Sequence, residues 1–285
     1  MSHRAIHVAI GVRRCISAFA AGVAVLVLAV AAGAAEPPPG ETYTPVPGQP
    51  GKDVVWVPTP EDTVRKMLDI ARVTERDFVI DLGSGDGRNV IAAAKRGARA
   101  LGVEYNPDLV ALSRRAAAAA GVSDKATFVH GDMFEADISQ ATVLLLFLLP
   151  QHLTRLAPRF MALQPGARVV SNTYGISGWE PDESVRAEPC RAWCIVNLYV
   201  VPAQVTGTWQ MGDGATLTLD QNYQRLFGTL HAHGVELPLE DAWLNGAAIR
   251  FTANRVRYEG RVKGGRMEGT AIGRAKRAWS ATALH

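Results

Sequence analysis

Residues 54–202 show two patterns of apolar positions, and these two patterns alternate along the chain. Short apolar runs, which are typical of buried strands, are separated by longer segments with apolar residues at helical spacing. The runs are 78–82, 98–103, 126–130, 143–148 and 168–172. The helical segments between them are 89–96, 108–120 and 153–163, and Thr59-Pro60 begins another helix before the first run. Strands that alternate with helices predict parallel βαβ units.

The pattern changes after Asn172. Residues 183–188 and 193–201 resemble an antiparallel pair. From Gly207 onward, short stretches rich in Thr, Leu, Val, Tyr and Phe are separated by Gly, Asn and Asp, at 208–211, 215–219, 223–231, 247–252, 255–262, 266–272 and 276–281. Evenly spaced strands with turn signals predict a small antiparallel barrel or sandwich. We therefore expect an α/β domain at 54–202 and a small all-β domain at 203–285.

The first 35 residues have the pattern of an export signal. Arg4, Arg13 and Arg14 precede an apolar run at 16–32, which is followed by the small residues 32–35. The Arg pair also has some likeness to a twin-arginine signal. Either a cleaved signal peptide, cut near Ala34 or Ala35, or an uncleaved membrane tether through 16–32 fits this pattern. Both predict an exported protein, periplasmic or membrane-anchored.

Residues 36–53 contain six prolines and three glycines, which predicts an extended, poorly ordered linker. The formal net charge is +3, and the three arginines of the leader account for it. A neutral body argues against nucleic acid as a partner, because phosphate binding needs a clustered positive field.

Two cysteines remain beyond the leader, Cys190 and Cys194. Four residues apart, they cannot bridge within one straight strand, but they could bridge across the turn between 183–188 and 193–201. Two unrelated buried thiols fit the sequence equally well. His231 and His233 have no third ligand at a convincing spacing, so we expect no metal site.

A glycine-rich loop follows the first predicted strand directly. It reads Asp81-Leu-Gly83-Ser84-Gly85-Asp-Gly87, and a helix follows it. Glycines permit positive φ angles and let a ligand lie against bare backbone, while the free N–H groups of the helix start point into the loop. The spacing differs from the Gly-x-Gly-x-x-Gly of nicotinamide-binding proteins, which argues against a dehydrogenase.

Acidic residues end the next two predicted strands. Glu104 stands 23 residues after Asp81, where a carboxylate can accept both ribose hydroxyls of a nucleoside. Asp132 ends the third strand, where a carboxylate can accept an adenine amino hydrogen and Met133 can cover the ring. Each acid taken alone could be an ordinary strand-end charge, but the glycine loop beside them favours a nucleoside site.

This order of motifs resembles that of class I S-adenosylmethionine-dependent methyltransferases. With 57–60, 148–150 and 165–172, it resembles more narrowly a group of small bacterial methyltransferases that are distantly similar to mitochondrial protein-lysine methyltransferases. The resemblance implies a Rossmann-like, seven-stranded, mostly parallel sheet with a final antiparallel strand. It also implies that Asp81, Gly83 and Gly85 face the methionine part of S-adenosyl-L-methionine, Glu104 the ribose, and Asp132 with Met133 the adenine. We place Ser84, Gly87 and Tyr105 in the same site.

The sequence departs from amino-methylating relatives at the fourth strand. They often carry Asn or Asp with Pro-Pro-Tyr there, whereas this chain has Phe147-Leu-Leu-Pro150. Amide or nucleobase methylation of that type is therefore not expected. Our candidates for direct involvement in catalysis are His152, Asn172 and Tyr174. A structural role is the alternative for each of them.

We therefore predict methyl transfer from S-adenosylmethionine to an unidentified acceptor, either a protein side chain or a small molecule. The alternative is a non-catalytic module that senses a nucleoside and binds its partner through the β domain. Trp209, Trp243 and Trp279 are expected in the core of that domain, although a barrel mouth is a plausible ligand site.

Overall fold

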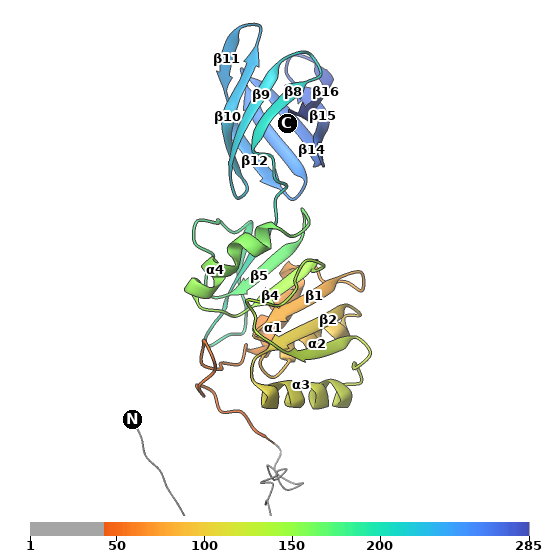
Figure 1. Ribbon diagram of the computed structural model, residues 1–285, viewed down its shortest axis with the longest axis vertical. Helices are drawn as coiled ribbons and strands as arrows, with labels where there is room; N and C mark the ends of the chain where they lie inside the picture. The colour runs from red at the N-terminus through yellow and green to blue at the C-terminus, as the bar shows by residue number, and fades with distance from the viewer. Residues whose placement is uncertain (1–42, 285) are drawn as a thin grey trace, which may run out of the picture. The chain divides into compact units, whose positions relative to one another are not determined.

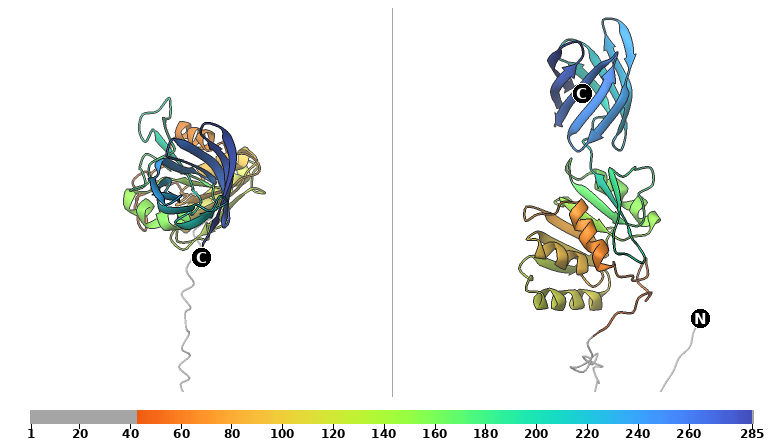
Figure 2. Two further views of the ribbon diagram at one scale, coloured as in Figure 1. Left: turned by 90° about the horizontal axis from the view of Figure 1, so that it is seen from above. Right: turned by 180° about the vertical axis from the view of Figure 1, so that it is seen from behind.

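The computed structural model describes residues 43–284, so the predicted leader at 1–35 and the first part of the linker lie outside the described residues. A seven-stranded sheet occupies the first part of this range (Figures 1 and 2). Its order is β3-β2-β1-β4-β5-β7-β6, and β7 runs antiparallel to β5 and β6. The strands are β1 (Phe78–Leu82), β2 (Arg99–Glu104), β3 (Ala126–His130), β4 (Val143–Leu146), β5 (Arg168–Asn172), β6 (Glu183–Arg186) and β7 (Ile195–Val200). This confirms the predicted sheet and its antiparallel pair.

Helices cover both faces of this sheet, and each face has its own apolar core. The helices are α1 (Glu61–Ile70), α2 (Arg88–Lys95), α3 (Pro107–Ala119) and α4 (Pro150–Met161). Val79 of β1 packs with α1, α2 and α3, while its neighbour Ile80 packs with α4 on the opposite face. Side chains alternate between the faces of a strand, so a parallel sheet covered on both faces needs strands that are apolar throughout. In β4 all four residues are buried, as its sequence predicts.

The remaining strands form an antiparallel barrel, which decides between the two predicted architectures. Pairing of β9 with β10 closes a ring of β8, β9, β10, β12, β13, β14, β15 and β16. The interior is filled by side chains that include the buried Trp209 and Trp279, as expected for a ring of this size. Trp243, also predicted in the core, is half-buried with Arg225 over its ring. The nine strands are β8 (Gly207–Met211), β9 (Thr216–Asn222), β10 (Arg225–Ala232), β11 (Val235–Pro238), β12 (Glu240–Asn245), β13 (Ala248–Ala253), β14 (Val256–Lys263), β15 (Arg266–Ile272) and β16 (Lys276–Ala283).

None of the helices in 43–284 is long and apolar enough to cross a membrane.

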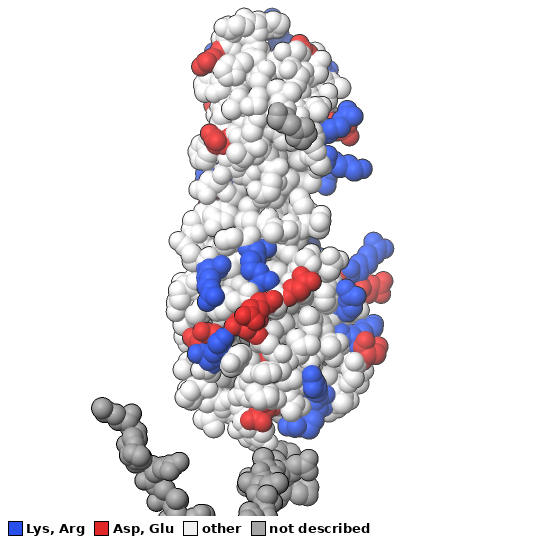
Figure 3. Space-filling model, in the orientation of Figure 1, with Lys and Arg blue, Asp and Glu red and all other residues white. Residues whose placement is uncertain are grey.

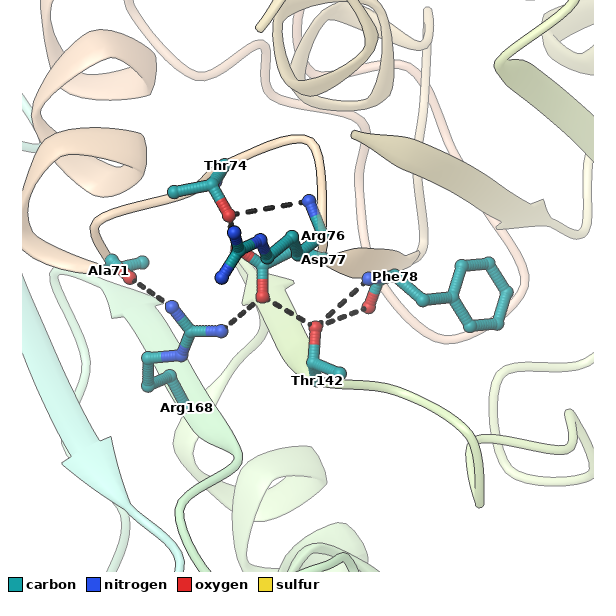
Figure 4. Close-up of polar contacts among 7 residues, drawn as sticks. All are labelled: Ala71, Thr74, Arg76, Asp77, Phe78, Thr142 and Arg168. Atoms are coloured by element: carbon teal, nitrogen blue, oxygen red, sulfur yellow. Dashed lines mark hydrogen bonds and ion pairs between the residues drawn. The ribbon is translucent and has the colours of Figure 1, made fainter. Parts of the chain in front are cut away.

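A buried ion pair ties together the ends of the sheet elements away from the glycine loop (Figure 4). The guanidinium of Arg168 on β5 donates to Asp77 and to the carbonyl of Ala71. Thr142 donates its hydroxyl to Asp77 at 2.8 Å and accepts the Phe78 N–H. Burial alone would raise the pKa of Asp77, but hydrogen bonds from Thr74 and Thr142 and the charge of Arg168 outweigh it and lower the pKa. The cluster therefore stabilises the fold while Asp77 is ionised.

Replacing Arg168 should destabilise the protein in a pH-dependent way. We expect Arg168→Leu to cost about 2–4 kcal/mol at pH 7, because it leaves a buried carboxylate without its cation. Since the pKa of Asp77 is depressed, its contribution is present above the unfolded pKa of about 3.9 and is lost as pH falls through the folded pKa. Urea denaturation should show that Arg168→Leu has a lower free energy of unfolding than the parent protein at pH 7. The difference between the two proteins should be smaller at pH 3.5. Arg277→Leu, which breaks an exposed pair with Asp213, is the control and should be near neutral at both pH values.

Candidate functional site

A cavity of about 320 Å³ lies at the carboxyl ends of β1, β2, β3, β4 and β5. Its volume is within the range of small-molecule sites. Of the predicted cofactor residues, the wall includes Asp81, Gly83, Ser84, Gly85, Glu104, Tyr105, Asp132 and Met133. These residues follow three different strands. The structure therefore brings the predicted nucleoside-binding motifs together around one space, as parallel strands with a common carboxyl edge require.

The glycine loop has a backbone conformation that residues with a side chain rarely adopt. Gly83, Gly85 and Gly87 have φ angles of 76°, 56° and 81°. The N–H groups of Gly83 and Ser84 donate to the carbonyl of Val103 on β2, which holds the loop against the neighbouring strand. Gly87 is the N-cap of α2 and, unlike the other two glycines, is absent from the cavity wall. A cofactor contact for Gly87 therefore stays a prediction.

Gly87 is required for packing. A Cβ at this position would lie 2.7 Å from the Phe128 ring and 2.8 Å from Cβ of Ser113, both buried. We expect Gly87→Ala to destabilise the protein by about 2–5 kcal/mol, from left-handed strain and overpacking together. Gly121→Ala is a matched control, since Gly121 also has positive φ but has open space around it. Denaturant unfolding should show the larger loss for Gly87→Ala; unchanged stability with lost ligand binding would instead indicate a direct cofactor contact.

Asp81 is a buried carboxylate at the floor of the cavity. Its side chain accepts a hydrogen bond from Asn89 Nδ2 at 3.1 Å. Burial raises the pKa of Asp81 to about 7, and the negative charges of Glu104 and Asp86 add to this effect. A cation bound beside this carboxylate would favour its ionised form. The raised pKa is therefore consistent with a site that receives a cation.

Glu104 connects the loop to the end of β2. One carboxylate oxygen accepts the Gly85 N–H and the other accepts the Asn106 N–H, both at 2.9 Å. The carboxylate thus fixes the glycine loop as well as lining the cavity.

The predicted linker contributes to this site, which its composition does not suggest. Residues 49–59 line the cavity, so the expectation of a poorly ordered linker is wrong for 49–53. Lys52 Nζ lies 2.5 Å from Asp132 Oδ2 and 4.6 Å from the centre of the Tyr105 ring. The hydrogen bond from Lys52 lowers the pKa of Asp132. Long-range pairing with the ends of β2 and β3 orders this Pro-rich segment.

Of the three candidate catalytic residues, one reaches the cavity wall. Tyr174 lines it, whereas Asn172 and His152 do not. Asn172 is fully buried, and its side-chain oxygen accepts the Thr173 hydroxyl. The His152 ring lies 5.7 Å from that of Phe134. Catalytic roles for these residues stay predictions.

Two aromatic residues that we did not select from the sequence stand beside Tyr174. Phe147 follows β4, and Trp193 lies in the loop between Cys190 and Cys194. These cysteines form a disulfide, which decides between the two interpretations of the pair. Phe147 was predicted to lie inside the fourth strand, which we expected to end at residue 148. The strand ends at Leu146, so Phe147 stands at its carboxyl end. That position is the signal that could have identified it.

Comparison with known proteins gives this geometry its family. The model of the ANTKMT methyltransferase domain matches residues 81–183. A protein-lysine N-methyltransferase of Saccharolobus islandicus is 44% identical over 151 residues, which are 52% of this chain and 94% of that protein. The chain belongs to the class I S-adenosylmethionine-dependent methyltransferases.

Other relatives of this methyltransferase match the same part of the chain. The adenine nucleotide translocase lysine N-methyltransferase of Mus musculus is 38% identical over 117 residues, 40% of this chain and 51% of that protein. This chain thus spans about half the length of the mouse relative. A solved RNA methyltransferase from Salinibacter ruber, in complex with S-adenosyl-L-homocysteine, is 45% identical and covers 52% of this chain and 96% of its own, with a TM-score of 0.49.

The described residues fit S-adenosylmethionine. Asp81 would offer a buried carboxylate to the amino group of its methionine part, and Glu104 would offer oxygens to its ribose. The buried Ser84 hydroxyl and Asn89 side-chain oxygen face this space without a hydrogen-bond partner in residues 43–284. Buried polar atoms normally have partners, so these two atoms at the cavity would be available to a bound polar ligand.

Proposed function

We propose that this methyltransferase methylates lysine side chains of a protein. One observation carries the proposal: the protein-lysine N-methyltransferase of S. islandicus is 44% identical over 94% of its own length. The mouse relative, which shares a shorter segment, is also named as a lysine methyltransferase. Two relatives with this acceptor class favour it over the small-molecule acceptor that the sequence left open.

The distribution of charge supports a protein acceptor rather than RNA. Basic and acidic side chains of the described residues are interspersed on the face shown in Figure 3, without a continuous basic stripe on that face. Binding to a nucleic-acid backbone depends on clustered Lys and Arg.

The chemistry expected of the protein is mainly alignment. When bound, S-adenosylmethionine supplies a methyl group on a sulfonium, which transfers by in-line displacement. Aligning the two reactants can account for about 7–11 kcal/mol of the barrier. Asp81 and Glu104 hold one end of the cavity in a fixed geometry, and a lysine amine has to be neutral when it attacks.

The experiment is labelled-methyl transfer from S-adenosylmethionine into an extract of the source organism. We expect label in protease-sensitive, RNase-resistant material, and acid hydrolysis should release it as methyllysine. Asp81→Asn protein is the negative control. Label in RNase-sensitive material would instead assign an RNA acceptor, and label in the small-molecule fraction would overturn the proposal as well.

We further propose that the protein acts outside the cytosol. The leader-like residues 1–35 support this, and so does the disulfide between Cys190 and Cys194, because disulfides persist in oxidising compartments. Residues 1–40 fused to a reporter that is active only after export should give signal, and replacing the apolar run 16–32 with polar residues should abolish it. A cytosolic reporter would contradict the proposal.

A further inference from the structure

Three aromatic side chains form a cluster on one side of the cavity. The Phe147 ring centre lies 6.5 Å from that of Tyr174 and 5.6 Å from that of Trp193, and Tyr174 and Trp193 are 6.3 Å apart. All three line the cavity. We propose that this aromatic cluster is the acceptor subsite and holds the substrate amine as a cation beside the rings. The inference rests on the proposed lysine specificity and adds how the amine is recognised.

The cavity has two chemically different halves. Its carboxylates come from the ends of β1 and β2, the segment after β3 and the N-terminal segment, at Asp53, Asp81, Asp86, Glu104 and Asp132. The aromatic cluster comes from the ends of β4 and β5 and from the loop before β7. No Asp or Glu from those elements lines the cavity within the described residues. An ammonium at the aromatic half therefore meets ring faces instead of a carboxylate, and ring faces attract cations.

The loop that carries Trp193 is held in place from three sides. The disulfide closes it, the hydroxyl of Thr63 in α1 donates to the Trp193 carbonyl at 3.3 Å, and the Ala187 N–H donates to the Cys194 carbonyl at 2.7 Å. Trp193 has a φ of 59° and is 39% exposed. A bulky residue in the left-handed region is uncommon and costs of order 1–3 kcal/mol, and such residues cluster at ligand sites. The side chain keeps an exposed part and lines the cavity, so contact with a ligand is the function that this arrangement suits.

The reaction needs the amine first as a neutral nucleophile and then as a cation. The proton of the bound ammonium leaves to water at the cavity mouth before attack, because only the neutral amine has a free lone pair. The nitrogen lone pair then forms the bond to the methyl carbon, and the electrons of the broken S–C bond stay on sulfur. The positive charge that was on sulfur is then on nitrogen, beside the rings that stabilise it.

The test compares a cation with a neutral molecule of the same shape. The probes are Nα-acetyl-trimethyllysine amide and its analogue with carbon in place of the quaternary nitrogen. Both would be titrated by calorimetry into the full chain saturated with S-adenosyl-L-homocysteine. We expect the cation to bind about 3–30-fold more tightly. Equal affinities, or no binding of either probe, would overturn the proposal.

Variants assign the effect to the cluster. Trp193→Ala should remove most of the preference for the cation, Trp193→Phe should retain most of it, and Trp243→Ala in the barrel should not change it. S-adenosyl-L-homocysteine should bind all of these variants with parental affinity, which also shows that they fold. A preference that survives both Trp193→Ala and Phe147→Leu would contradict the assignment.

The disulfide that closes the Trp193 loop has its own test. The double variant Cys190→Ser with Cys194→Ser should weaken binding of the cation about as much as Trp193→Ala, without changing affinity for S-adenosyl-L-homocysteine. Unchanged binding of the cation would show that the disulfide does not position the ring. Because these are binding measurements, a failure of lysine methylation in extracts would leave them interpretable: cation preference without methyllysine refutes the proposed function, and methyllysine without cation preference refutes the subsite.

Discussion

Asp81→Asn is expected to weaken cofactor binding strongly and, at the same time, to make the protein more stable. The buried carboxylate would pair with the amino group of S-adenosylmethionine, and its loss should weaken binding by about 10³-fold, as expected for breaking a buried ion pair. The stability gain has a separate origin. The pKa of Asp81 is raised to about 7, so the folded protein must bear the cost of an ionised, desolvated carboxylate at alkaline pH.

The sign of the stability effect follows from proton linkage. Between the unfolded pKa of about 3.9 and the folded value of about 7, the folded protein binds the extra proton, so stability falls as pH rises. The full penalty is about 4 kcal/mol above pH 7, and an amide, which keeps an oxygen for Asn89, avoids it. Calorimetric scans should show Asp81→Asn melting about 8–16 °C higher at pH 8.5 and with little difference at pH 4. If Asp81→Asn melted at a lower temperature than the parent protein at pH 8.5, ionised Asp81 would not destabilise the fold.

Affinity for S-adenosylmethionine should depend strongly on pH. The ligand's amino group favours the ionised form of Asp81, whereas the free protein holds this acid protonated below about pH 7. We therefore expect the dissociation constant to be nearly constant above pH 7.5 and to rise about tenfold per unit below pH 6.5. Binding near pH 6 should release close to one proton, measurable by calorimetry in buffers of different ionisation enthalpy.

Asp81→Asn provides the control for that dependence. It should bind weakly and without the pH slope, since no acid at this position titrates. A slope of the same size in Asp81→Asn would assign the proton to another group. Asp132 is an unsuitable candidate for it, because its pKa is lowered and it stays ionised over this range.

The α/β architecture could be predicted because it depends on local pattern. Apolar runs and helical spacing placed β1, β3 and β5 at their observed bounds. The barrel was predicted less completely, since Val235–Pro238 and Glu240–Asn245 were missed as strands. Only Leu244 is buried among these residues, so they lack the apolar alternation by which strands are recognised. A register shift between Glu240 and Trp243 weakens the pattern further.

The parts of the site that we did not predict depend on contacts between segments far apart in the chain. Lys52 meets Asp132, and the Trp56 ring lies against Gly85, although nothing in a Pro-rich segment indicates such partners. Helix α4 begins at Pro150, three residues earlier than predicted, because proline fits the first turn of a helix. The earlier end of β4 leaves Phe147 at the cavity wall.

The parallel sheet and the order of the cofactor motifs can be derived from the amino-acid sequence: a glycine loop with Asp81 and two acids at the next strand ends. Each of these features depends on neighbouring residues, and the common carboxyl edge of parallel strands brings them together. Which aromatic residues gather at the far side of the cavity depends on the complete fold. Phe147, Tyr174 and Trp193 belong to three separate segments, and their meeting depends on sheet order, on the hairpin turn and on the disulfide that closes it. Contacts of that kind are set by packing across the whole domain, so no local pattern records them.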